Sequence, residues 1–261
     1  MSLPPRAART TLRHVVVVSA CLSACIGVPA GPQGGFAGDG DRVLFIGNSH
    51  TYVNDVPGLV QAFADSAGAG EISTGSIAKP GYALIDHYLE SPTRTFTSRC
   101  DGITHLVLQQ GWTPGGVYRD TLTIAAKGFA ELVARCNTKV VLYQVWPLRS
   151  QPQYFPLTIE SFAVAARESR SLLAPVAQAW ELAISRGVTA ELWDADGLHA
   201  SPAGSYLAAL VLYERIVSRS PVGLPATVRT RSGTTITLAP ELARLLQQAA
   251  ADVVGAGQGG S

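Results

Sequence analysis

From residue 42 onward, short apolar runs alternate with longer stretches in which apolar positions recur at helical spacing. The apolar runs predict five strands, at 42–46, 71–77, 104–109, 139–145 and 171–175. The longer stretches predict helices at 55–67, 83–90, 120–135, 158–168, 177–186 and 202–217. Strands that alternate with helices are typical of a parallel sheet, so we expect an α/β fold, a three-layer α/β/α sandwich around a five-stranded parallel sheet.

The C-terminal part of the chain has a different pattern. Residues 220–237 are rich in Pro, Thr and Arg and predict irregular structure, and a short helix is expected near 239–253. The Gly-rich end predicts a mobile tail. We therefore expect one α/β domain over 41–218 and a C-terminal extension over 219–261.

The N-terminus has the pattern of an export signal. Three arginines precede an apolar run that is too short to span a bilayer, which predicts a signal peptide over 1–25 and a flexible linker over 26–40. The run ends in Leu-Ser-Ala-Cys, which resembles a bacterial lipobox, so Cys25 is expected to be lipidated. The alternative is ordinary cleavage near 28–30, with Cys25 discarded. In both cases we expect an exported protein, either in the bacterial cell envelope or secreted. A lipid on Cys25 would be its only contact with a membrane.

The net charge and the cysteines indicate which partners, covalent bonds and cofactors to expect. The formal net charge is +1 and becomes −2 without the three N-terminal arginines, so nucleic acid is not an expected partner. Export makes Cys100 and Cys136, each just before a predicted strand, candidates for a disulfide; two separate buried thiols are the alternative. No CxxC or HxxxH pair occurs, and we expect neither a metal nor a cofactor.

Ligands of open parallel sheets bind beyond the carboxyl ends of the strands. Polar and aromatic residues gather at four of these ends: Gly47-Asn48-Ser49-His50, Lys79-Pro80-Gly81-Tyr82, Gln109-Gln110-Gly111-Trp112 and Gln144-Val145-Trp146-Pro147. This set is unusual for simple turns. It therefore points to a site that includes Ser49.

A serine hydroxyl needs a base to take its proton, and the base is usually a histidine held by a carboxylate. His199 is the best placed of the five histidines, because the other four belong to the signal, a turn, a helix and a strand: His14, His50, His87 and His105. Asp196 lies three residues before His199, a spacing that lets its carboxylate turn back to Nδ1 and leaves Nε2 free for Ser49. The alternative is an Asp-Gly turn with a surface histidine.

In this order the motifs resemble the SGNH branch of the GDSL-type hydrolases, over residues 42 to about 217. The matching features are Gly-Asn-Ser after the first strand, a glycine after the second, an amide after the third and Asp-x-x-His near the end. The resemblance implies a flavodoxin-like fold and an esterase with Ser49 as nucleophile, His199 as general base and Asp196 as its partner. It also implies that the N–H groups of Ser49 and Gly81 bind the oxyanion.

The chain departs from the family pattern in two places. Asn48 replaces the commoner aspartate, a change that we expect to cost little because that carboxylate is outside the triad. The third block reads LVLQQGWTPGG and lacks the usual asparagine donor. A glutamine can supply the same N–H, as in branches that include carbohydrate acetylesterases. We expect Gln109 in this role, with Gln110 as the alternative.

Three aromatic residues follow strand ends and are expected to rim the cleft: Tyr82, Trp112 and Trp146. Aromatic rings stack on sugar faces, so we expect a small-molecule or glycan ester as substrate, with deacetylation of a glycan as one reaction. The alternative is that these rings cap the core. A lipid or lysophospholipid ester remains open, and so does a non-catalytic lipoprotein that keeps the fold to bind glycan.

Overall fold

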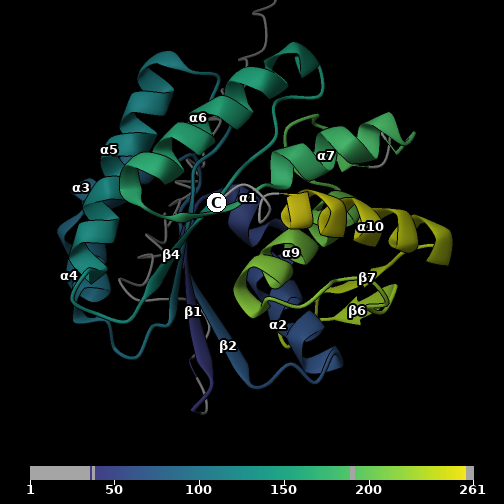
Figure 1. Ribbon diagram of the computed structural model, residues 1–261, viewed down its shortest axis with the longest axis horizontal. Helices are drawn as coiled ribbons and strands as arrows, with labels where there is room; N and C mark the ends of the chain where they lie inside the picture. The colour runs from purple at the N-terminus through teal and green to yellow at the C-terminus, as the bar shows by residue number, and fades with distance from the viewer. Residues whose placement is uncertain (1–35, 37–38, 189–191, 257–261) are drawn as a thin grey trace, which may run out of the picture.

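The computed structural model describes residues 36, 39–188 and 192–256 (Figure 1). The predicted signal peptide, the lipidation site at Cys25 and most of the linker lie outside these residues. The last part of the predicted mobile tail, 257–261, lies outside them as well.

A five-stranded parallel sheet forms the centre of the molecule, as the apolar pattern predicted, with the strand order β2-β1-β3-β4-β5. Its strands are β1 (Asp41–Gly47), β2 (Ile72–Ala78), β3 (His105–Gln109), β4 (Lys139–Tyr143) and β5 (Leu172–Ala174). The inner strands β1, β3 and β4 are largely apolar on both sides because helices cover both faces of the sheet. In β1, Val43 and Phe45 pack on one face, and Leu44 and Ile46 pack on the other.

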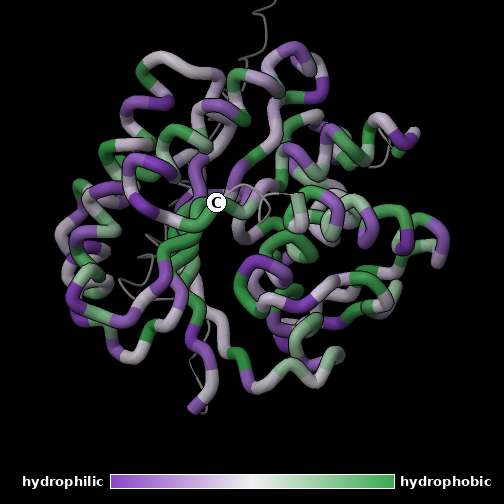
Figure 2. Tube along the Cα trace, viewed as in Figure 1, coloured by the Kyte–Doolittle hydropathy of each residue, from purple (hydrophilic) through white to green (hydrophobic). Residues whose placement is uncertain are grey.

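The helices form the two outer layers of the sandwich (Figure 1). One layer contains α3 (Leu84–Leu89), α4 (Ser91–Arg99), α5 (Gly116–Val133) and α6 (Phe155–Ser169). The other contains α2 (Val56–Ser66), α7 (Val176–Ser185), α9 (Pro202–Val217) and α10 (Pro240–Ala256). The short helices α1 (Ser49–Tyr52), η1 (Val53–Asp55) and η2 (Pro152–Tyr154) lie in connections. Figure 2 shows the apolar strands running through the middle, between helices with mixed surfaces.

Helix α4 and the hairpin of β6 and β7 are among the elements that the sequence did not predict. Helix α4 has the sequence SPTRTFTSR, which has no apolar period, and it buries mainly Thr93 and Thr97. The segment expected to be irregular contains an antiparallel hairpin, β6 (Thr227–Arg229) and β7 (Thr235–Thr237). Each of these strands buries one aliphatic side chain between two exposed polar ones, a pattern too short to stand out in the sequence.

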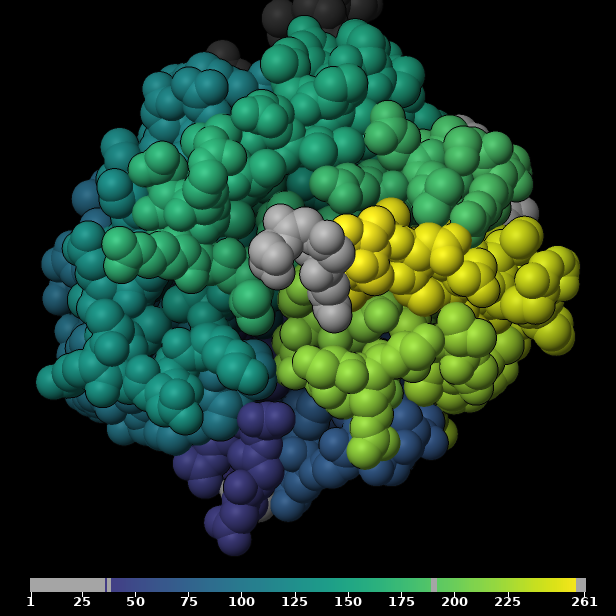
Figure 3. All heavy atoms as spheres, viewed as in Figure 1, coloured from purple at the N-terminus to yellow at the C-terminus, as the bar shows by residue number. Residues whose placement is uncertain are grey.

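The C-terminal helix is longer and better integrated than the sequence indicated. Helix α10 spans 17 residues and contributes Ala243, Leu246 and Ala249 to the same apolar core as α7 and α9. Figure 3 shows α10 in yellow on the front face, and the helix packs against α9 and α7. Residues 219–256 therefore belong to the packed body of the α/β domain.

Cys100 and Cys136 are joined in a disulfide, with Cα atoms 6.3 Å apart. Cys100 precedes β3 and Cys136 precedes β4, so the bridge lies at the amino ends of neighbouring strands, the edge opposite Ser49. Within the described part of the chain, none of the helices combines the length and apolarity needed to cross a membrane.

Candidate active site

Ser49 is the first residue of α1, directly beyond the carboxyl end of β1. The turn before it is closely packed, and a Cβ at Gly47 would clash with Gln109 Oε1 and Thr51 Oγ1. Asn48 caps the helix, because its Oδ1 accepts the backbone N–H of His50 at 3.1 Å. The sequence Gly-Asn-Ser thus ends the strand and begins a helix within three residues, which places the serine hydroxyl at the edge of the sheet.

His199 lies on a turn between two antiparallel-bridged residues, Trp193 and Ala200. The turn is held from outside at both sides of the histidine. Trp146 Nε1 donates to the carbonyl of Leu198 at 3.1 Å, and Asn54 Nδ2 donates to the carbonyl of Ala200 at 3.1 Å. These bonds fix the backbone that carries the imidazole.

The predicted nucleophile, base and carboxylate lie within hydrogen-bonding distance of one another. His199 Nε2 is 2.8 Å from Ser49 Oγ, and His199 Nδ1 is 2.5 Å from Asp196 Oδ2. An Nδ1–H that donates to the carboxylate leaves Nε2 as the acceptor for the serine hydroxyl. Residues 150 positions apart in the chain thus form a Ser-His-Asp relay.

Asp196 is held as an anion. Its Oδ1 accepts the backbone N–H groups of Leu198 and His199, both at 2.9 Å, while its Oδ2 faces the imidazole. The hydrogen bond from His199, followed by that from Leu198, lowers the pKa of Asp196 to about 2. The carboxylate therefore keeps its charge, and its orienting role, around neutral pH.

A second histidine, His50, lies beside the relay but is not suited to be its base. Its ring centroid is 5.4 Å from that of His199 and 5.2 Å from that of Trp146. Burial, with a smaller effect from His199, lowers the pKa of His50 to about 3. The ring stays neutral and fills the space behind the site, consistent with the turn-shaping role inferred from its place next to Ser49.

Two backbone N–H groups are available as oxyanion donors. Those of Ser49 and Gly81 have no hydrogen-bond partner among the described residues. Gly81 adopts a positive φ of 71°, and open space surrounds the position of its missing Cβ. Asn48 Nδ2 donates to the carbonyl of Tyr82 at 2.9 Å and thereby ties the Gly81 loop to the nucleophile turn.

The side chain of Gln109 packs against the turn that carries Ser49. It is fully buried, and its Oε1 accepts from the Asn48 N–H at 2.7 Å and from Thr51 Oγ1 at 2.9 Å. Its Nε2 is buried from solvent and has no hydrogen-bond partner among the described residues. Gln109 thus supports the turn that carries Ser49 through its oxygen, and a donor role for its Nε2 stays a prediction.

The alternative donor, Gln110, is also engaged elsewhere. Its Oε1 accepts the Leu84 N–H at 3.2 Å, and its Nε2 donates to Thr113 Oγ1 and to the carbonyl of Tyr118. It joins the loop after β2 to the loop after β3. The Gln110 amide is therefore engaged on both sides, whereas the backbone N–H groups of Ser49 and Gly81 and the Nε2 of Gln109 have no partner among the described residues.

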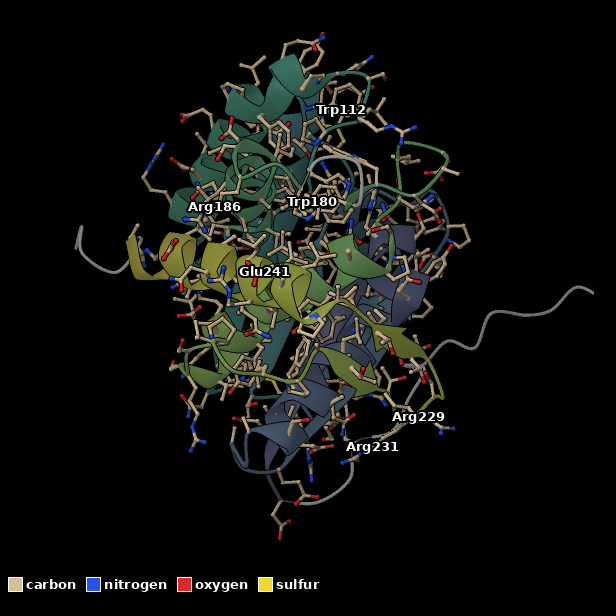
Figure 4. All side chains as sticks on the ribbon, turned by 90° about the vertical axis from the view of Figure 1, so that its right-hand side faces the viewer. Trp112, Trp180, Arg186, Arg229, Arg231 and Glu241 are labelled. Atoms are coloured by element: carbon tan, nitrogen blue, oxygen red, sulfur yellow. A yellow bond between two sulfur atoms is a disulfide. The ribbon has the colours of Figure 1, made fainter. Side chains whose placement is uncertain are left out.

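Of the three aromatic residues expected at the rim, Trp146 is buried, so its assignment is wrong. It is 1% exposed and stacks on Trp180 with centroids 3.8 Å apart. The core-capping alternative therefore holds for this residue. Tyr82 and Trp112, the latter labelled in Figure 4, are partly exposed. Tyr82 donates its hydroxyl to Glu90 at 3.0 Å, and Trp112 meets Tyr154 edge-on.

Sequence reasoning missed two polar side chains that support the site. Asn54, with a positive φ of 57°, holds the loop of His199, and His87 Nε2 donates to the carbonyl of Gly47 at 2.7 Å. The sequence contains one weak indication of a special role for Asn54, which is that it precedes Asp55 at the predicted start of a helix. His87 was assigned to a helix, and nothing local indicated that it reaches across to the end of β1.

Comparisons with known proteins agree with the fold. No family model and no curated protein matches the chain. A solved structure described as a "putative SGNH hydrolase" from Slackia heliotrinireducens is 27% identical, with a TM-score of 0.57 over 68% of this chain and 100% of that one. A DUF4886 family protein from Bacteroides uniformis is 16% identical, with a TM-score of 0.65 over 82% and 94%. The psychrotrophic esterase EstA from Pseudoalteromonas is 15% identical, with a TM-score of 0.50 over 69% and 98%. The chain therefore has the α/β fold found in SGNH hydrolases.

Proposed function

We propose that the protein is a serine hydrolase that cleaves carboxylic esters through an acyl-enzyme, with Ser49 as nucleophile, His199 as general base and Asp196 as its orienting partner. One observation carries the proposal: the unbroken path from Ser49 Oγ to His199 Nε2 and from His199 Nδ1 to Asp196 Oδ2, at 2.8 and 2.5 Å. It is supported by a fold shared with SGNH hydrolases and esterases.

The first half of the reaction forms the acyl-enzyme. Ser49 Oγ attacks the ester carbonyl while His199 Nε2 takes the hydroxyl proton. The carbonyl oxygen becomes an anion that accepts from the N–H groups of Ser49 and Gly81. The tetrahedral intermediate then collapses, the bond to the alcohol oxygen breaks, and the imidazolium gives its proton to that oxygen.

The second half returns the free enzyme. Water takes the place of the alcohol, loses a proton to His199 Nε2 and attacks the acyl carbon. The bond to Ser49 Oγ breaks as the imidazolium returns the proton to it. The ionised Asp196 stabilises the imidazolium in both halves, because its pKa of about 2 keeps it negative.

The rival function is non-catalytic binding of glycan on the same fold. Its support in the sequence was the altered third block, but the two glutamines of that block have structural hydrogen bonds. A pure binding protein has no need of a hydrogen-bonded Ser-His-Asp path. Export, lipidation at Cys25 and deacetylation of a glycan remain part of the proposal, as does a lipid or lysophospholipid ester as the alternative substrate.

Serine labelling combined with esterase kinetics tests the proposal. EstA is described as inhibited by monoethylphosphonate, so a phosphonate probe is a suitable reagent. We expect the probe to label the wild type, and Ser49→Ala to lose labelling and at least about 10³-fold of p-nitrophenyl acetate hydrolysis. His199→Ala should fall about as far, because the residues act as a unit.

Ser185→Ala, on an exposed serine of α7, is the matched control and should keep both labelling and activity. EDTA should have no effect, since no step of this reaction uses a metal. Esterase activity that survives Ser49→Ala, or that EDTA abolishes, would show that the nucleophile is assigned wrongly.

A further inference from the structure

The hairpin of β6 and β7 lies beside the segment that follows the nucleophile. Its connecting turn, 230–234, is fixed to that segment, because Ser232 Oγ donates to Asp55 Oδ2 at 2.6 Å. Arg231 forms an ion pair with Asp65 of α2 at 3.2 Å, and Figure 4 shows it at the hairpin next to that helix. Val228 and Ile236 anchor the two strands in the core. The turn therefore has a defined place.

A cavity of about 530 Å³ lies between this turn, the edge strand β2 and the start of α2. Its lining includes Tyr52, Asp55, Thr74, Ser76, Arg231 and Thr234. A volume of this size holds one or more sugar rings. The cavity is next to the relay in the fold, because Tyr52 is three residues after Ser49 on α1 and residues at that spacing share a helix face.

Most of the residues that line the cavity are polar, and their charges balance. The lining has one carboxylate and one guanidinium, and Pro57 is the single aliphatic side chain among the described residues around it. The hydroxyls of Ser76 and Thr234 have no hydrogen-bond partner in the described part of the chain. The cavity therefore offers an acyl chain few aliphatic side chains to pack against. A neutral ligand rich in hydroxyl groups suits it.

Tyr52 adds an exposed aromatic face. Tyr52 as a residue is 42% exposed, which is high for a large residue beside a candidate active site. Such a ring packs against the apolar C–H face of a sugar, while the surrounding Asp, Arg and hydroxyl groups bond to the sugar hydroxyls. The combination favours a carbohydrate over a lipid.

We propose that this cavity is the subsite for the alcohol part of the substrate and that it binds a neutral oligosaccharide whose acylated hydroxyl reaches Ser49. The proposal rests on the function given above and makes it more specific. The acyl group passes from the sugar oxygen to Ser49 Oγ, and the sugar leaves with the proton from His199.

The test is direct binding of neutral oligosaccharides to the full chain carrying Ser49→Ala, which prevents turnover. Xylohexaose, cellohexaose and chitohexaose are titrated separately by calorimetry. We expect at least one to bind, and its affinity to fall about tenfold or more when Tyr52→Ala or Arg231→Ala is added. Tyr52→Phe keeps the ring and should restore binding. The matched controls Tyr118→Ala and Arg229→Ala, on exposed residues outside the cavity, should leave it unchanged.

Two results would overturn the proposal: none of the three oligosaccharides binds, or binding is indifferent to Tyr52→Ala and Arg231→Ala. Phosphonate labelling of the protein with Ser49 intact reports separately on the function. Labelling without oligosaccharide binding would leave the esterase in place and remove this subsite. Binding without labelling would keep the subsite and remove the esterase.

Discussion

Asn48 joins the parts of the candidate site through three hydrogen bonds. Its N–H donates to Gln109, its Oδ1 accepts from the His50 N–H, and its Nδ2 donates to the carbonyl of Tyr82. An aspartate can reproduce the first two bonds but not the third, since an ionised carboxylate has no donor. Asn48 thus ties the turn that carries Ser49 to the loop that carries Gly81, whose backbone N–H groups are the oxyanion donors in the proposed reaction.

Asn48→Asp is expected to lower kcat for p-nitrophenyl acetate by about tenfold to a hundredfold with little change in KM. The carboxylate would face the Tyr82 carbonyl and push the Gly81 loop away, and a misplaced donor acts on the charge that develops in the transition state. Steady-state kinetics decide the matter. A kcat close to that of the wild type would mean that the Gly81 N–H holds its position without Asn48.

The position of a single residue could be predicted from the sequence where the residue follows a strand end or lies a few positions from its partner. The position of Ser49 followed from the end of an apolar run, and the contact of Asp196 with His199 followed from a spacing of three. The role of Gln109 did not, because it depends on how closely Gly47 approaches from the neighbouring strand. Trp146 was misplaced because a strand end gives no information on whether the next ring turns outward or into the core.

At the scale of elements, the connection from η1 to α2 holds the site together. Asn54 and Asp55 both have positive φ, at 57° and 55°, a conformation that costs non-glycine residues energy. Their side chains gain bonds in return: Asn54 to Ala200 and Ser205, and Asp55 to Gly58 and Ser232. The turn thus links the nucleophile helix to the base loop and to the C-terminal hairpin, and no local sequence pattern predicts such distant partners.

The disulfide joins two elements at the far edge of the sheet and is expected to act on stability alone. Replacing Cys100 and Cys136 by serine reopens a loop with a sequence separation of 36 residues, which costs about 3–4 kcal/mol in the chain-entropy account. We expect a lower melting temperature with kcat and KM unchanged. Mass spectrometry of unreduced tryptic peptides of exported protein should find the linked pair, and two freely alkylated thiols would contradict it.

At the scale of the whole molecule, the strand and helix pattern predicted the sheet and most of both helical layers. It did not predict that the C-terminal residues complete one of those layers. Helix α9 is buried along nearly its whole length because α2, α7 and α10 surround it. Its continuous apolar sequence predicts burial but does not indicate which helices pack against it. The extension inferred from a change in composition is therefore part of the core.

Glu214 of α9 gives a test of this packing, because burial raises the pKa of its carboxyl group to about 7 and its Oε2 has no partner among the described residues. The ordinary value is 4.5, so between these values the folded protein holds a proton on Glu214 that the unfolded chain has lost, and the contribution of Glu214 to stability falls as the pH rises. The lowered pKa of His50 acts in the opposite direction, so the effect of Glu214 is read as the difference between the wild type and Glu214→Gln. Glu214→Gln removes the buried charge, so from about pH 5 to about pH 8 its melting temperature should rise relative to that of the wild type and exceed it at the higher pH. Glu160→Gln, on an exposed site of α6, should leave the wild-type curve unchanged, and a Glu214→Gln curve parallel to it would show that Glu214 is well solvated.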